Sequence, residues 1–224
     1  MGNQFDYRSA TFVGTGDTDI ASNDDHSSQA VVLPRYWVSD DIASERVSRR
    51  SWGTNSAMLG SRRVARNTDE RTVIAAVIPW GAASYGWIIS AGPSAEGLAI
   101  LCAQYNSFVF DFLARQFLTQ PSIPQSTFEQ LPAVTVDRLR TGTAGVARVD
   151  DFIVKRSVAL CATGLELGTW SRECGQAALS DWDLSIRAFV RAELDAMFFH
   201  LFGVARDDVD YIMETFPIVK RKDI

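Results

Sequence analysis

The chain has 224 residues, of which 46% are hydrophobic and 22% are charged, and its formal net charge is −5. These values are typical of a globular protein with one large or two small domains. No run of eighteen or more apolar residues occurs, which excludes a membrane-spanning helix, and MGNQFDYRS lacks the apolar segment of a secretion signal. Three widely spaced cysteines without a C-x-x-C pair favour reduced thiols, so we expect a cytoplasmic protein.

Basic charge is carried almost entirely by arginine, with nineteen Arg against three Lys. Residues 31–140 hold eleven arginines and nine acidic residues, a net of +2, whereas residues 181–224 hold nine acidic and six basic residues, a net of −3. The planar guanidinium group of arginine forms two hydrogen bonds at once with a phosphate or a guanine edge. The arginines of residues 31–140 therefore favour DNA binding. A GC-rich genome produces the same excess of arginine without any function, and this alternative stays open.

The first elements of the chain are predicted to be short. Residues 1–30 are polar and read as an irregular, linker-like segment. Leu33–Val38 alternates enough to predict a strand, with Tyr36 and Trp37 as packing anchors. A short helix is expected over 41–50, and a solvated helix surface is the plain interpretation of its arginines.

The next block is the most strand-like part of the sequence. Residues 62–66 and 72–79 are predicted to be two strands joined by a turn at 67–70. Thr72–Ile78 is an almost unbroken apolar run, so we expect a central strand that is covered on both faces. A glycine-rich loop and a further strand, GWIIS, follow within 80–90.

The stretch from Leu98 to Pro132 is the one around which the chain is organised. Apolar residues at spacings of three and four predict a single amphipathic helix from Leu98, with Phe108 and Phe112 buried. The polar face of that helix is expected to carry these residues: Asn106, Asp111 and Arg115. Two prolines then force an extended loop at 119–127, which suits a recognition loop on a rigid scaffold, although a plain surface connection has the same pattern.

The rest of the chain is predicted to be helical. Residues 136–149 read as a linker, and helices are expected over 150–167, 183–203 and 207–215. The buried stripe of the second helix includes Ile186 and Phe189. The predicted fold class is α+β: a mixed-sheet recognition domain packed with helices, followed by a helical C-terminal subdomain. The expected divisions are 1–30, 31–135, 136–149 and 150–224.

Several motifs, taken in order, resemble one known family. They are QFDYR at 4–8, LPRYWV at 33–38, RRVARNTDERTVIAAVIP at 62–79, NSFVFDFLARQ at 106–116 followed by QLP, RAELDAMFFHLFGV at 191–204 and DDVDYIMETFPIVKR at 207–221. Together they resemble the C-terminal target-recognition region of type IIG restriction enzymes fused to N6-adenine DNA methyltransferases, and distantly the specificity subunits of type I restriction enzymes. The resemblance covers nearly the whole chain and implies that the helical tail is a spacer.

Catalytic motifs are missing from this sequence. It has no Pro-Pro dipeptide, and therefore no N/D-P-P-Y/F motif, and no acidic residue followed two positions later by lysine, as nucleases use. Two histidines leave no metal-ligand cluster and no Ser-His-Asp set. We therefore expect no enzyme activity and no cofactor, since S-adenosylmethionine would bind the absent catalytic domain. A small enzyme with an unfamiliar site is the remaining exception.

The resemblance implies sequence-specific recognition of double-stranded DNA, with a methyltransferase or nuclease domain as partner in cis or in trans. The alternative is a non-catalytic interaction module that docks a protein through the acidic helical tail. Arginine and glutamine side chains at the recognition motifs are the candidate DNA-binding residues, because they bind phosphates and the edges of guanine and adenine. These candidates are Arg46, Arg49, Arg50, Arg62, Arg63, Arg66, Arg115, Gln116, Gln120 and Gln125.

Overall fold

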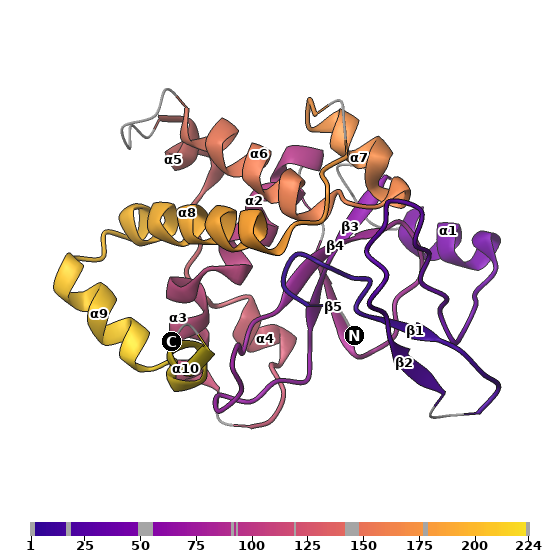
Figure 1. Cartoon of the computed structure of the whole chain (residues 1–224), viewed down its shortest axis with the longest axis horizontal. Helices are drawn as coiled ribbons and strands as arrows, with labels where there is room; N and C mark the ends of the chain where they lie inside the picture. The colour runs from indigo at the N-terminus through magenta and orange to yellow at the C-terminus, as the bar shows by residue number, and fades with distance from the viewer. Residues whose placement is uncertain are drawn as a thin grey trace.

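The computed structural model describes residues 3–16, 19–48, 56–90, 92, 94–118, 120–141, 148–176 and 179–222. The fold class is α+β: helices combine with two small antiparallel sheets, and the β1–β2 sheet lies at the edge of the molecule (Figure 1). The strands are β1 Ala10–Phe12, β2 Ile20–Ser22, β3 Ala57–Arg62, β4 Ala75–Pro79 and β5 Trp87–Ser90. The helices are α1 Asp40–Ser48, α2 Ala95–Asn106, α3 Phe108–Phe117, α4 Gln125–Phe128, α5 Val136–Thr141, α6 Val149–Cys161, α7 Gly168–Glu173, α8 Leu184–Phe202, α9 Arg206–Glu214 and α10 Pro217–Lys222, with a 3-10 turn at Leu165–Leu167.

The central sheet has the order β4-β3-β5, so the predicted central strand at 72–78 is wrong in its position. β3 pairs with both neighbours, and β4 lies at one edge. Ala75, Ala76 and Val77 at that edge are nevertheless buried. The side-chain amide of Asn106 satisfies the backbone groups of Ala75 as another strand would. Asn106 Oδ1 accepts from the Ala75 N–H at 3.0 Å, and Asn106 Nδ2 donates to the Ala75 carbonyl at 2.9 Å.

The organising helix is two helices, not one. α2 and α3 meet at Ser107 with a bend of 66°. The Ser107 hydroxyl donates to the Gln104 carbonyl at 2.7 Å, and its oxygen accepts from the Phe110 N–H at the start of α3. One serine therefore ends the first helix and begins the second. Its hydroxyl replaces helical backbone hydrogen bonds, which the spacing of apolar residues does not reveal.

The bend changes which residues reach the core. Phe110 is only 1% exposed, whereas Phe108 and Phe112, predicted to be buried, are half-buried. Asn106 and Asp111, predicted on the polar face, are buried as well. Polar groups stay in such a place when they are hydrogen-bonded.

Asp111 is the centre of a buried ionic network. Its Oδ2 accepts from Arg71 Nε at 2.9 Å and from the Thr72 N–H at 2.9 Å, and its Oδ1 accepts from Arg115 Nε at 3.0 Å. Arg115 also donates to the Thr215 carbonyl at 3.1 Å. The network thus fixes α3 to the segment before β4 and to the end of α9.

The predicted divisions of the chain are not divisions of its core. One apolar cluster includes Phe5, Leu59, Leu139 and Phe198, from all four predicted segments. α2 packs against α6, and α6 packs against α8. Residues 1–30 are therefore not a linker, and the predicted linker contains α5. Residues 142–147 lie outside the described residues.

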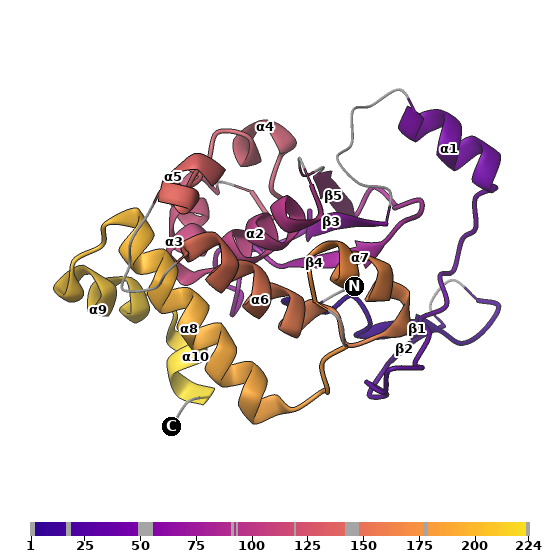
Figure 2. The same cartoon turned by 90° about the horizontal axis from the view of Figure 1, so that it is seen from above.

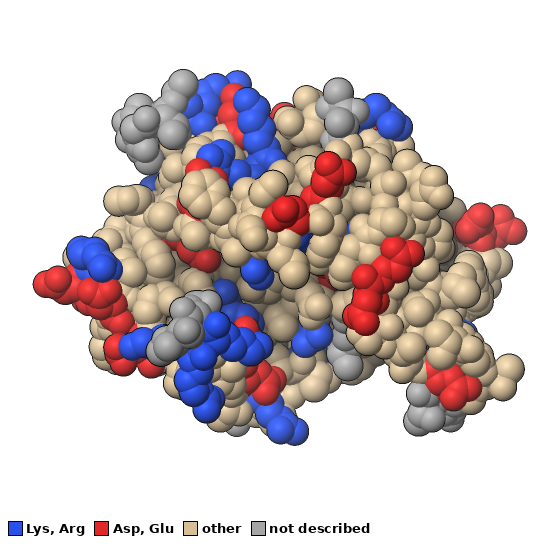
Figure 3. Space-filling view, in the orientation of Figure 1, with Lys and Arg blue, Asp and Glu red and all other residues tan. Residues whose placement is uncertain are grey.

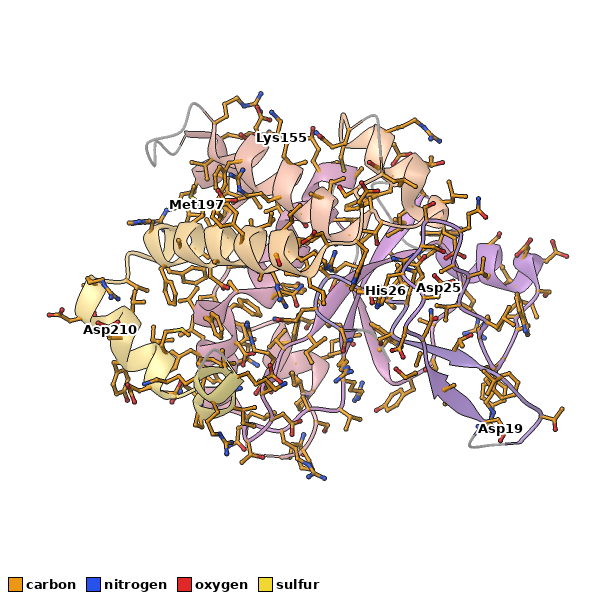
Figure 4. The ribbon with its side chains drawn as sticks, in the orientation of Figure 1. Asp19, Asp25, His26, Lys155, Met197 and Asp210 are labelled. Carbon is orange, nitrogen blue, oxygen red and sulfur yellow. The ribbon has the colours of Figure 1, made fainter. Side chains whose placement is uncertain are left out.

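The N-terminal segment is held by buried polar contacts. Arg8 is 1% exposed and donates to Thr163 Oγ1 at 2.6 Å. His26 stacks on Trp182 with ring centroids 3.7 Å apart, and the Arg187 guanidinium also lies 3.7 Å from that ring. Figure 4 shows His26 near the strands of the N-terminal segment. Sequence reasoning missed the contacts of Arg8 and His26 because their partners, Thr163 and Trp182, are more than 150 residues away in the chain.

The other elements follow the sequence more closely. β5, α1, α8 and α9 lie within about two residues of their predicted ranges, and α8 begins after the cap residue Asp183 and ends at Gly203, whose φ is 71°. The strand predicted at 33–38 is wrong: that segment is irregular, and its Tyr36 and Trp37 are 71% and 76% exposed. Within the described residues, no single helix is both long enough and apolar enough to cross a membrane.

Candidate nucleic-acid interface

The strand predicted at 62–66 is wrong, because β3 ends at Arg62 and residues 63–66 are irregular. The structure nevertheless brings this arginine-rich segment and the predicted recognition loop together. The Ile123 N–H, in the middle of the loop, donates to the Arg63 carbonyl at 2.8 Å. Ile123 is 2% exposed and packs in a second apolar cluster with Phe110 and Phe128. We call residues 62–66, 84–86 and 120–125 the arginine–loop surface.

An exposed aromatic ring completes this surface. Tyr85 is 78% exposed, and the Arg63 guanidinium lies 4.0 Å from the centre of its ring. The Arg63 N–H donates to the Gly86 carbonyl at 3.0 Å, which fixes the loop of Tyr85 beside the end of β3. A guanidinium stacked on an aromatic ring keeps its donors free in one plane, which suits phosphates and base edges.

Tyr85 was not among the sequence candidates. The signal for it was present, because this tyrosine lies in the loop between Gly81 and Gly86, where a large side chain has few neighbours to pack against. Val64, which is 60% exposed, lies on the same surface and was also not among the sequence candidates.

Arg62 and Arg66 have different environments on the surface. Arg66 is exposed, and its backbone N–H donates to Asp69 Oδ2 at 3.1 Å. Arg62 is half-buried, its Nε is buried without a partner among the described residues, and burial lowers its pKa.

Three glutamines were predicted to reach bases. Gln120 is exposed on the loop, whereas Gln125 is exposed as the first residue of α4, which replaces the end of the loop predicted at 119–127. Gln125 Nε2 donates to Glu129 Oε1 at 2.7 Å. Gln116 is exposed on the last turn of α3, where its amide contacts the Phe112 carbonyl at 3.3 Å.

Arg115 is not available for DNA. Its side chain is 8% exposed, and its donors are used by Asp111, Thr215 and the carbonyls of Asp69 and Glu70. The Phe216 ring lies 4.0 Å from its guanidinium. We therefore correct this assignment: Arg115 is a structural residue.

Of the three candidate arginines at 46–50, the one that α1 contains, Arg46, is not brought to the arginine–loop surface. Arg46 is exposed, but Figures 1 and 2 both show α1 at the far end of the molecule from α3 and α4. The other two, Arg49 and Arg50, lie outside the described residues. The prediction that all the arginines line one face therefore fails for Arg46.

A cavity of about 340 Å³ opens beside the loop. Tyr105, Phe110 and Phe128 form part of its wall, and the rings of Tyr105 and Phe128 meet edge to face at 4.8 Å. Gln125 and Glu129 also line it, and both are exposed. The cavity thus joins the solvent-facing part of the arginine–loop surface to the second apolar cluster.

No group of three or more potential metal ligands occurs among the described side chains. Comparison of the chain with protein-family models, with curated proteins and with solved structures finds no match.

Proposed function

We propose that this chain recognises double-stranded DNA as the specificity part of a restriction–modification adenine methyltransferase, without a catalytic centre of its own. The observation that carries the proposal is the contact between Arg63 and the recognition loop through Ile123. It makes one continuous surface from a basic strand end, an exposed tyrosine and a polar loop. Phosphate-binding and base-reading groups must be adjacent in this way to act on one duplex.

In this proposal the two kinds of side chain have separate tasks. Arg62, Arg63 and Arg66 bind phosphates and set the position of the duplex. Gln120 and Gln125 read base edges, since a glutamine amide can donate and accept at the same adenine. The rigid anchor of Ile123 keeps the loop in place, which lowers the entropic cost of binding.

The catalytic steps belong to a partner domain. S-adenosylmethionine would bind there, and methyl transfer or cleavage would occur there, while this chain supplies the orientation of the DNA. The purified chain alone should therefore transfer no methyl group to DNA. Incorporation of labelled methyl groups by the chain alone would contradict this part of the proposal.

Duplex binding is tested by fluorescence anisotropy with a labelled duplex over a series of salt concentrations. Three phosphate-contacting arginines predict that log K falls with log salt with a slope of about −3, at about 0.9 per phosphate. An interaction module without DNA binding would give no saturable signal, or one that does not depend on salt.

A second candidate function has one observation in its favour. Leu184, Ile186 and Phe189, on the first turns of α8, are 72%, 63% and 66% exposed, although the last two were predicted to be buried. The next helix is acidic along its outer side, and Figures 3 and 4 show that side, with Asp210, facing solvent. We propose that a protein partner docks on this helical tail. The catalytic domain itself can be that partner.

A further inference from the structure

A second cavity, of about 450 Å³, lies between the bend of α2 and α3 and the helices α8 and α9. Its volume is within the range of small-molecule sites, about 300–1,000 Å³. Much of its wall is apolar, and Phe5, Phe199 and Met213 belong to it. Two side chains of opposite charge, Arg71 and Asp195, line the same cavity. An apolar wall with a few convergent charged groups is typical of a ligand site.

Asp195 has one carboxylate oxygen without a partner. Its Oδ1 accepts from the Phe108 N–H, at the start of α3, at 2.8 Å. Its Oδ2 makes no hydrogen bond with any residue that the structure describes. Burial raises the pKa of Asp195 to about 6, and the nearby charge of Arg71 offsets this effect only in part. The carboxylate is therefore charged at pH 7 and lacks a positive group in direct contact.

Arg71 has an unused donor at the same cavity. Its side chain is 9% exposed, and its Nε and Nη2 donate to Asp111 and to the Asn106 carbonyl. Its Nη1 has no acceptor within the described part of the chain. Phe108 connects the two charged groups, because the Arg71 guanidinium lies 4.0 Å from the centre of its ring while its N–H binds Asp195. Arg71 nevertheless forms its ion pair with Asp111 and not with Asp195.

The two unpaired groups define the ligand. A ligand with a single charge would pair one of them and leave the other away from water without a partner, which is costly. A small zwitterion pairs both. Arg191, an exposed residue that also lines the cavity, adds a second guanidinium for the anionic end. The apolar wall favours an apolar remainder, and an α-amino acid with an apolar side chain combines these three features.

We propose that this cavity binds an apolar α-amino acid as its zwitterion, with the ammonium group on Asp195 Oδ2 and the carboxylate on Arg71 Nη1 and Arg191. The apolar side chain would lie against the wall that contains Phe199 and Met213. The inference does not rest on the proposed DNA binding, because the cavity wall contains none of the candidate DNA-binding residues that the structure describes.

The test is a titration of the full chain, followed through the methyl NMR signal of Met213 in the cavity wall. The probes are L-phenylalanine and three compounds that each lack one part of it. Phenethylamine lacks the carboxylate, 3-phenylpropanoate lacks the ammonium group, and glycine lacks the apolar side chain. Phenylalanine should give a saturable shift, and the first two analogues should bind about 10- to 150-fold more weakly, the value of one hydrogen bond to a charged group. Glycine should bind more weakly than phenylalanine because it buries no apolar side chain.

Two variants assign the charged ends. Asp195→Asn keeps an oxygen that can accept from the Phe108 N–H and removes only the charge, so it should fold, bind phenylalanine at least about 10-fold more weakly and no longer prefer it to 3-phenylpropanoate. Arg191→Gln should weaken phenylalanine and 3-phenylpropanoate but not phenethylamine. Asp210→Asn, on the exposed side of α9, is the matched control and should bind all probes as the parent does.

Three results would overturn the inference: no saturable shift with phenylalanine, equal affinities for phenylalanine and its analogues, or unchanged binding in Asp195→Asn. None of them would bear on the proposed function, which the DNA titration tests separately.

Discussion

Replacement of Asp111 with alanine should be among the most damaging single changes in this protein. The carboxylate is fully buried and accepts hydrogen bonds from Arg71, Arg115 and the Thr72 N–H. Removing one partner of a buried ion pair costs about 3–5 kcal/mol, because the remaining charge is left without compensation. Arg71 and Arg115 keep other acceptors, so we expect a loss of about 4 kcal/mol.

The assay is urea unfolding followed by far-UV circular dichroism. With a slope of about 2 kcal/mol per molar urea, the midpoint of the variant should fall by about 2 M. Asp210→Ala is the matched control, since Asp210 makes an exposed ion pair with Arg206 and should cost less than about 0.5 kcal/mol. A loss below about 1 kcal/mol for Asp111→Ala would refute the reasoning that this network holds α3 in place.

Three further expectations follow from the core and from two titrating groups. Phe110→Ala should cost about 3–5 kcal/mol in urea unfolding and Phe112→Ala clearly less, because only the first ring is fully buried; equal losses would contradict the bend between α2 and α3. Burial raises the pKa of Asp195 from 3.8 to about 6, so its charge destabilises the fold above pH 6, and this effect disappears as the pH falls from 6 to 4. Asp195→Asn should therefore be more stable than the parent at pH 8 by about 1–2 kcal/mol and lose this advantage at pH 4. A stability difference that is the same at pH 8 and pH 4 would contradict this expectation. Burial lowers the pKa of His26 below 6.5, so the unfolded chain binds the proton more readily and stability should fall below pH 6.5; His26→Gln should remove that loss, as unfolding midpoints at pH 7 and pH 5 would show.

Much of the helical part of the fold was predictable from local signals. Asp183 and Gly203 mark the two ends of α8, and both are residue types that favour those positions for backbone reasons. Local signals failed where polar residues enter the core. Asn106 and Asp111 look like surface residues because their partners, Ala75 and Arg71, are distant in sequence. A prediction from periodicity alone therefore placed the wrong residues on the buried face of α3.

The candidate site was predicted in part, for the same physical reason. The polar loop and the cluster of arginines at 62–66 were each recognisable, although residues 63–66 do not form the predicted strand. Their proximity depends on one long-range backbone hydrogen bond between Ile123 and Arg63. Arg115 resembled a surface arginine, and only its three backbone acceptors in distant segments show that it is structural. Tyr85 had no motif at all and became visible through its exposure and its contact with Arg63.

The central claim is that the arginine–loop surface binds DNA. Its most direct test compares the salt dependence of duplex binding between two triple variants that remove equal charge. One variant replaces Arg62, Arg63 and Arg66 with alanine; the control replaces three exposed arginines elsewhere, Arg140, Arg172 and Arg206. The first should reduce the slope of log K against log salt by about three phosphate equivalents, and the control should leave the slope unchanged. Equal slopes for the two variants would contradict the claim.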